Sequence, residues 1–100
     1  MALIEKTIED AIKTYLTNRY GDRVYFFKTH GGPYQKRGVP DLVGCLDGHF
    51  FGFEVKKPGG KPTRQQEHNI VKIRKAGGIT GVVTSTVEVM NYLRGIDNGG

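Results

Sequence analysis

The sequence predicts an α/β sandwich built around a mixed central sheet, with the element order α-β-β-β-α-β-α. Three observations predict this class. The N-terminal segment has one helical apolar stripe, residues 41–57 hold two apolar runs joined by Asp47-Gly48, and a well-punctuated helix precedes a further apolar run at 79–85. Because the hairpin must be antiparallel and the β-α-β step after it should be parallel, the sheet is expected to be mixed.

The first helix is predicted over 2–21, with apolar residues at Ile4, Ile8, Ile12 and Leu16 on one face and Gly21 as its stop. Residues 23–29 (RVYFFKT) are aromatic and β-branched and form a predicted strand. Residues 30–40 hold three glycines, two prolines and two cations, which indicates a loop. A loop this long in a small domain is expected to be mobile or functional.

Two strands follow, at 41–46 and 49–57, with the Asp47-Gly48 turn between them. The next helix has Thr63 as its N-cap, with Glu67 nearby, and ends at Gly77-Gly78. After the strand at 79–85, a short last helix begins where Ser85 and Glu88 have the spacing of a capping box.

The composition fits one ordinary globular domain, which we place at 1–96, followed by a tail at 97–100 that is expected to fray. No apolar run approaches the length of a membrane span. The single cysteine, Cys45, is interpreted as a small buried hydrophobe; it cannot form an internal disulfide and favours a reducing compartment. We therefore expect a cytoplasmic protein, or one of the host-cell cytoplasm if it is viral. A net charge of +5 makes the domain a candidate binder of nucleic acid.

Three charged residues are predicted to converge on the hairpin. Alternation along 49–57 places Glu54 and Lys56 on one face with Phe50 and Gly52, and the turn brings Asp41 opposite residues around Glu54, with pairing sums near 95–96. An ordinary cross-strand salt bridge would explain the charges. The apolar surroundings and the Gly- and Pro-rich loops on both sides favour a site instead.

Two carboxylates at close range repel each other unless a cation lies between them. Mg²⁺ or Mn²⁺ fits, because both ions prefer oxygen ligands and leave room for a phosphate oxygen. Lys56 would then lie beside the scissile phosphate and offset developing charge. The pattern therefore predicts phosphodiester hydrolysis.

These residues resemble a known family. Gly-Val-Pro-Asp at 38–41, a gap of twelve residues and Glu54-Val55-Lys56 match the PD-(D/E)xK nuclease signature. The fuller pattern, RGVPDLVG, GHFFGFEVKKPGGKPT, Gln66 and AGGITGVV, is similar to the VRR-NUC family, whose stand-alone viral or bacterial members have about this length. The resemblance covers nearly the whole chain and implies a restriction-endonuclease-like sandwich.

The resemblance also implies roles for single residues. It implies that Asp41 and Glu54 bind the divalent metal with the backbone carbonyl of Val55, that Lys56 is the catalytic lysine, and that Gln66 could hold water or phosphate at the start of its helix.

Such nucleases further supply a glutamate from the first helix, and two residues are candidates. Glu5 falls inside the apolar stripe and Glu9 at its edge, at about 100° per residue. A buried carboxylate needs a partner, which favours Glu5. An edge position could reach around the end of the sheet, which keeps Glu9 open.

The flanking loops carry a cluster of cations and two rings that are expected to contact nucleic acid. A solvated loop charge is a serious alternative for any one of them, but not for the cluster. The expected DNA-binding residues are Lys28, His30, Tyr34, Lys36, Arg37, Lys57, Lys61 and Arg64.

We therefore expect a Mg²⁺- or Mn²⁺-dependent deoxyribonuclease. The resemblance, with Tyr20, Tyr92 and the terminal helices judged exposed, implies a homodimer acting on branched DNA such as Holliday junctions. A non-catalytic nucleic-acid-binding module on the same fold is the alternative. Hydrolysis of a small phosphoester is a remoter one, because the sequence lacks a GxxxxGK[ST] phosphate loop.

Overall fold

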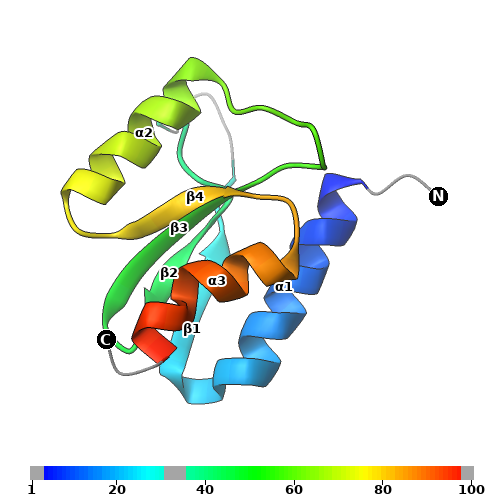
Figure 1. Ribbon diagram of the computed structural model, residues 1–100, viewed down its shortest axis with the longest axis vertical. Helices are drawn as coiled ribbons and strands as arrows, with labels where there is room; N and C mark the ends of the chain where they lie inside the picture. Colours follow the sequence, from blue (N-terminus) through cyan, green and yellow to red (C-terminus); the bar gives the residue numbers. More distant parts are fainter. Residues whose placement is uncertain (1–3, 31–35, 98–100) are drawn as a thin grey trace.

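The computed structural model describes residues 4–30 and 36–97 and has the predicted order of elements. Its helices and strands are α1 (Glu5–Tyr20), β1 (Val24–Lys28), β2 (Leu42–Leu46), β3 (His49–Val55), α2 (Arg64–Lys75), β4 (Ile79–Val83) and α3 (Thr86–Asp97), with a short 3₁₀ turn at Gly21–Arg23 (Figure 1). Within this part of the chain the strands form one sheet in the order β1-β2-β3-β4. Strand β2 pairs antiparallel with both β1 and β3, and β3 pairs parallel with β4, so the mixed sheet is confirmed.

Most of the core lies on one face of the sheet, between the strands and helices α1 and α3. Alternation along β3 turns Phe51, Phe53 and Val55 to this face, where all three are buried. Helix α1 adds Ile8, Ile12 and Leu16, and α3 adds Val89, Leu93 and Ile96. Each buried aliphatic or aromatic side chain contributes about 1.5–3 kcal/mol, so this face carries most of the stability.

Helix α2 lies on the opposite face and contacts β3 and β4. Ile70 is its buried apolar residue, and a Cβ at Gly78 would meet both Ile73 and Phe50, which shows how closely the helix and the sheet approach each other. Because α2 reaches only this half of the sheet, β1 and β2 are left less covered on the same face.

The helix ends follow the sequence signals in part. Helix α1 ends before Gly21, which has a φ of 54°. Thr63 caps α2 as expected, and Gln66 completes a capping box with it. At α3 the expected box is half formed: Ser85 Oγ accepts from the Glu88 N–H, whereas the Glu88 carboxylate binds Thr84.

Two burial expectations were wrong. Cys45 is exposed, because its side chain points to the open half of the α2 face. Tyr20 is buried against the core, whereas Tyr92 is partly exposed and packs on Phe53. None of the described helices is long and apolar enough to cross a membrane.

Candidate active site

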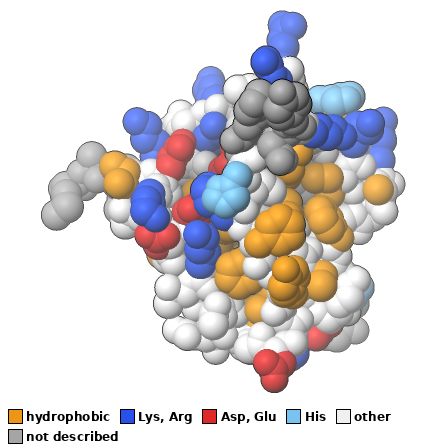
Figure 2. All heavy atoms as spheres, turned by 180° about the vertical axis from the view of Figure 1, so that it is seen from behind, with side chains coloured by type: hydrophobic (Ala, Val, Ile, Leu, Met, Phe, Trp, Pro, Cys, Tyr) orange, Lys and Arg blue, Asp and Glu red, His pale blue; other side chains and the backbone are white. Residues whose placement is uncertain are grey.

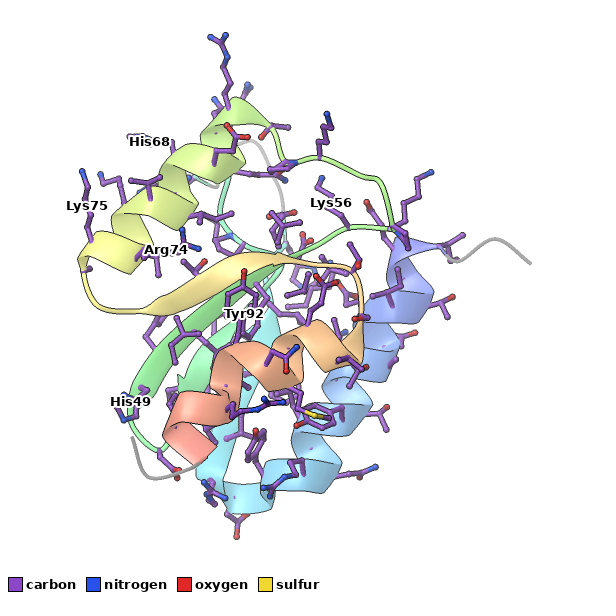
Figure 3. The ribbon with its side chains drawn as sticks, viewed as in Figure 1. His49, Lys56, His68, Arg74, Lys75 and Tyr92 are labelled. Carbon is purple, nitrogen blue, oxygen red and sulfur yellow. The ribbon has the colours of Figure 1, made fainter. Side chains whose placement is uncertain are left out.

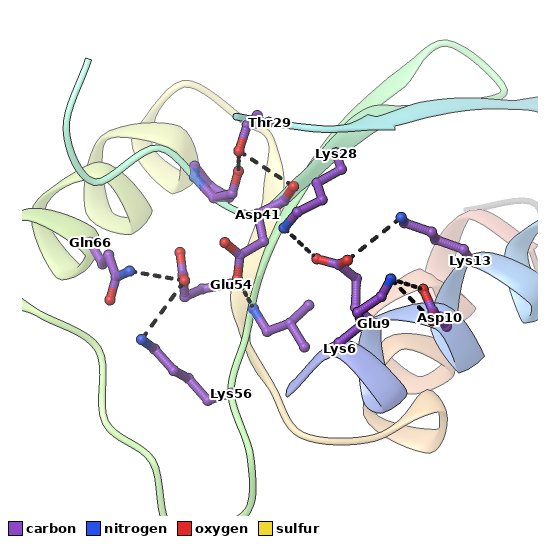
Figure 4. A network of polar contacts seen from close by, with 12 residues as sticks. Lys6, Glu9, Asp10, Lys13, Lys28, Thr29, Asp41, Glu54, Lys56 and Gln66 are labelled. Carbon is purple, nitrogen blue, oxygen red and sulfur yellow. Dashed lines mark hydrogen bonds and ion pairs between the residues drawn. The ribbon is translucent and has the colours of Figure 1, made fainter. Parts of the chain in front are cut away.

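The hairpin brings Asp41 and Glu54 to the same end of the sheet. Leu42 pairs with Phe53, a pairing sum of 95, which extends to Asp41 opposite Glu54 and confirms the expected register. Asp41 Oδ2 accepts a hydrogen bond of 3.0 Å from the Val55 N–H. Asp41, which directly precedes β2, is thereby fixed against Val55, the last residue of β3 (Figure 4).

Glu54 is a buried carboxyl group, with 2% of its surface exposed. One oxygen, Oε1, accepts from Gln66 Nε2 at 2.9 Å and lies 4.0 Å from Lys56 Nζ. The other, Oε2, is buried and has no hydrogen-bond donor among the described residues. Burial, together with the adjacent Asp41, raises the pKa of Glu54 to about 8. The Glu54 carboxyl group therefore keeps its proton up to about neutral pH, because neither burial nor the adjacent carboxylate favours the charged form.

Gln66 connects the start of α2 to this pair. Its Oε1 accepts from the Thr63 N–H at 2.8 Å, its N–H donates to Thr63 Oγ1, and its Nε2 donates to Glu54. One side chain therefore closes the capping box and orients Glu54. We assign Gln66 as a positioning residue for that carboxylate.

Replacing Gln66 with alanine should lower the free energy of unfolding by about 1–2 kcal/mol, because the side-chain half of the capping box and a hydrogen bond to a buried carboxyl group are lost. Urea denaturation measures the change. Gln65→Ala is the matched control, since Gln65 is exposed in the same turn. Equal stability of the two variants would contradict the positioning role.

The segment before Asp41 is held from both sides. Thr29 Oγ1 donates to the Pro40 carbonyl at 2.8 Å, and the Thr29 N–H donates to the Asp41 carbonyl. On the other side Asn69 Nδ2 donates to the Arg37 carbonyl. Gly38 has a φ of 79°, and a Cβ there would lie 2.5 Å from the backbone of Gln65. The Gly-x-Pro-Asp spacing therefore lets the loop pass against α2 on its way to the carboxylates.

The first-helix glutamates differ from the expectation that placed Glu5 inside the buried face. Glu5 is exposed, whereas Glu9 is 6% exposed. Glu9 is buried because Lys28 Nζ binds it at 2.6 Å and Lys13 lies 3.5 Å away. The hydrogen bond to Glu9 raises the pKa of Lys28. Both glutamates line a hollow of about 270 Å³ that also reaches Asp41 and Val55.

A larger hollow of about 530 Å³ lies on the other side of Asp41. Lys28 and Asp41 line both hollows, so the two meet at the candidate site. Four of the expected DNA-contacting residues line the larger one: Lys28, His30, Lys36 and Arg37. Lys57, Lys61 and Arg64 are exposed but line neither hollow, and Tyr34 lies outside the described residues.

Lys56 follows the end of β3, and its side chain is 17% exposed. The turn after it packs against its stem: the Gly60 N–H donates to the Lys57 carbonyl, and a Cβ at Gly60 would lie 3.2 Å from Lys56 Cβ. Figure 3 shows Lys56 at the end of the sheet opposite His49, and His68 on α2 away from Lys56. These two histidines are therefore not part of the site.

The chemistry of the donor set fits a hard divalent cation. The unpartnered Glu54 Oε2 and the Asp41 carboxylate are oxygen donors whose mutual repulsion a cation would relieve. A hydrogen-bonded residue in an antiparallel ladder turns its N–H and C=O to the same neighbour, so the Val55 carbonyl is expected to face the Asp41 side. Among the described residues no group of three or more His, Cys, Asp or Glu side chains is arranged to hold a metal, and Glu9 binds Lys28.

Comparison with solved structures gives this arrangement a family context. One "VRR_NUC domain protein" superposes with a TM-score of 0.76 and 19% identity, covering 100% of this chain and 93% of that one. A "VRR_NUC domain" superposes with a TM-score of 0.65 and 26% identity, covering 86% and 94%. The chain has the VRR-NUC fold.

The VRR-NUC resemblance seen in the motifs is thereby confirmed, as is the restriction-endonuclease-like α/β sandwich. No protein-family model and no curated protein matches the sequence. The likeness covers the hairpin and both flanking loops, since the first match spans the whole chain.

Sequence reasoning missed the positioning residues Thr29 and Asn69 and the ion pair between Lys28 and Glu9. A signal for the pair was present. Alternation in β1 turns Val24, Phe26 and Lys28 to the core side, and a lysine on a core face needs an acidic partner.

Proposed function

We propose that this chain is a DNA nuclease that depends on Mg²⁺ or Mn²⁺. The observation that carries the proposal is the pair of Asp41 and Glu54, with Lys56 beside it, at the edge of a basic hollow. The similarity to VRR_NUC domains supports it. A reducing compartment such as the cytoplasm suits its one free thiol, Cys45.

In the proposed reaction Asp41 and Glu54 would hold the cation, and Lys56 would reach the phosphate. A bound divalent ion supplies positive charge to the phosphate and activates water. The Lys56 ammonium offsets the charge that develops on the phosphate oxygens. Lys28, Lys36 and Arg37 bind neighbouring phosphates and keep the backbone in line for attack.

We further propose that the nuclease selects branched DNA, such as Holliday junctions, and acts as a homodimer. A protomer of 11.1 kDa has little surface for gripping a duplex, whereas two copies can present two sites to a branched substrate. Sedimentation that reports only a particle of 11.1 kDa would exclude the dimer.

Cleavage assays test the activity directly. Four-way junctions, duplexes and single strands are incubated with Mg²⁺, Mn²⁺ or EDTA, beside Asp41→Ala. We expect cutting of the junction with either metal, none in EDTA, and a loss of about 10²–10³-fold or more in Asp41→Ala.

Asp22→Ala is the matched control, because Asp22 is an exposed aspartate in the 3₁₀ turn at the end of α1. Binding of every substrate without metal-dependent cleavage would replace the enzyme with a non-catalytic nucleic-acid-binding module. Full activity in Asp41→Ala would overturn the site assignment.

A further inference from the structure

An exposed aromatic face lies on the α2 side of the sheet. Tyr25, Phe27 and Phe50 define it, with 68%, 51% and 46% of their surfaces exposed. Tyr25 and Phe27 lie on β1 with ring centroids 6.2 Å apart. In Figure 2 the apolar side chains form a continuous patch beside histidine and lysine or arginine side chains.

The aromatic face is aligned with the candidate active site. The register places Tyr25, Cys45 and Phe50 in one row across the sheet, and Phe27, Val43 and Gly52 in the next. One further step of two residues, about 7 Å, leads from Val43 to Asp41 and from Gly52 to Glu54. Side chains in these rows point to the same face, so the rings and the carboxylates share one face of the sheet, with Pro40 packed over Gly52 between them.

The edge of the aromatic face nearest the site is basic. His30 lies beyond the end of β1 and lines the hollow together with Lys36 and Arg37. Lys28, whose side chain leaves β1 on the opposite face, reaches the same hollow from the end of the strand. The chain has a net charge of +5. A partner that runs from the hollow onto the rings should therefore carry negative charge and flat apolar groups.

A second copy of this chain fits these observations less well. Three rings, each of about 150–250 Å² and exposed by about half, offer roughly 300–400 Å². A stable interface needs about 800 Å² on each partner. Two copies would also bring like charges together around the rings.

We infer that the aromatic face stacks unpaired bases of a single-stranded segment whose phosphates occupy the basic hollow. Aromatic side chains on a sheet face are a general way of binding splayed bases, and the stacking tolerates any sequence. A duplex keeps its base faces inside its own stack. The inference rests on the proposed nuclease and adds that its substrate carries unpaired nucleotides next to the scissile phosphate.

Fluorescence anisotropy in EDTA tests the inference without cleavage. The probes are a labelled 12-nucleotide oligothymidylate and an abasic strand of the same length, which keeps the phosphates but has no bases. The wild type should bind the thymidylate more tightly. Phe27→Ala and Tyr25→Ala should each weaken that binding about 5–10-fold and leave the abasic strand within about twofold.

Val87→Ala is the matched control, since Val87 is 59% exposed on α3, across the sheet from the rings. Its two affinities should equal those of the wild type. The salt dependence of thymidylate binding should also be unchanged in Phe27→Ala, because the phosphate contacts are kept. Circular dichroism melting confirms that each variant is folded.

Unchanged thymidylate affinity in both ring variants, or an equal loss on both probes, would overturn the inference. So would a dimer that dissociates in Phe27→Ala, which would assign the face to a second copy. If the wild type cleaves DNA but the ring variants bind thymidylate as the wild type does, only the inference is wrong. If the preference for thymidylate depends on the rings but the wild type cleaves no substrate, only the proposed activity is wrong.

Discussion

Lys56→Ala should lower the single-turnover rate of DNA cleavage by about 10²–10³-fold while DNA affinity in EDTA changes only a few-fold. Loss of a single group that stabilises developing charge has an effect of this size. The ammonium lies 4.0 Å from Glu54 Oε1, and its stem is packed against the turn at 57–60, so the charge is held at the carboxylates. A mobile surface lysine would not be fixed in this way.

Lys75→Ala is the control, because it removes the same charge from the far end of α2 (Figure 3). Lys56→Arg should recover only part of the rate, since a planar guanidinium does not replace a compact ammonium in a packed site. If both variants of Lys56 cleave at the wild-type rate, the lysine has no part in the reaction.

The hairpin half of the site was predictable because its geometry is local. A two-residue Asp-Gly turn fixes the register of the strands it joins, and the register fixes which side chains share a face. Asp47 has a φ of 51° and Gly48 one of 84°, the backbone that such a turn requires. Asp41 and Glu54 therefore follow from sequence alone.

The helical contribution was not predictable in the same way. A helical wheel shows which residues of α1 share a face, but it does not show how far the helix extends past the sheet. Glu5 lies in the first turn of α1, beyond the core contacts of Ile8. Glu9 is buried through Lys28, a residue on a strand 19 positions away. Alternation in β1 indicates that Lys28 needs an acidic partner, but only the packing of α1 against the sheet decides that this partner is Glu9.

The open aromatic face could not be predicted for a related reason. The segment VYFFK has apolar residues on both faces of the strand, a pattern that is typical of a buried strand. Only the position of α2, over β3 and β4, shows that Tyr25 and Phe27 are uncovered. The sequence specifies the strand, but the packing of a distant helix decides its exposure.

The second large effect concerns Glu54 and pH. In EDTA the wild type should become less stable as pH rises from about 4.5 to about 8, with a slope near 1.4 kcal/mol per unit. Burial raises the pKa of Glu54 to about 8, so over this range the folded protein keeps a proton that the unfolded chain has lost. The folded state is therefore favoured at low pH, and this advantage is lost as pH rises through the folded pKa.

Glu54→Gln removes the titration and keeps the shape of the side chain. Its stability should vary less with pH than that of the wild type, and at pH 8 it should exceed the wild type by roughly 3–5 kcal/mol. Urea denaturation between pH 5 and pH 8 measures both slopes. Glu67→Gln, at an exposed position in α2, should follow the wild type. Parallel slopes for Glu54→Gln and the wild type would show that Glu54 is ionised throughout.

The same proton links stability to the proposed cation. Mn²⁺ needs both carboxylates ionised, so its binding at pH 7 should release about one proton and its affinity should rise as pH approaches 8. Calorimetry in two buffers with different ionisation enthalpies counts that proton. Glu54→Gln should release none and bind Mn²⁺ more weakly. The carboxyl group that makes the folded protein less stable at high pH would then be the one prepared to hold the metal.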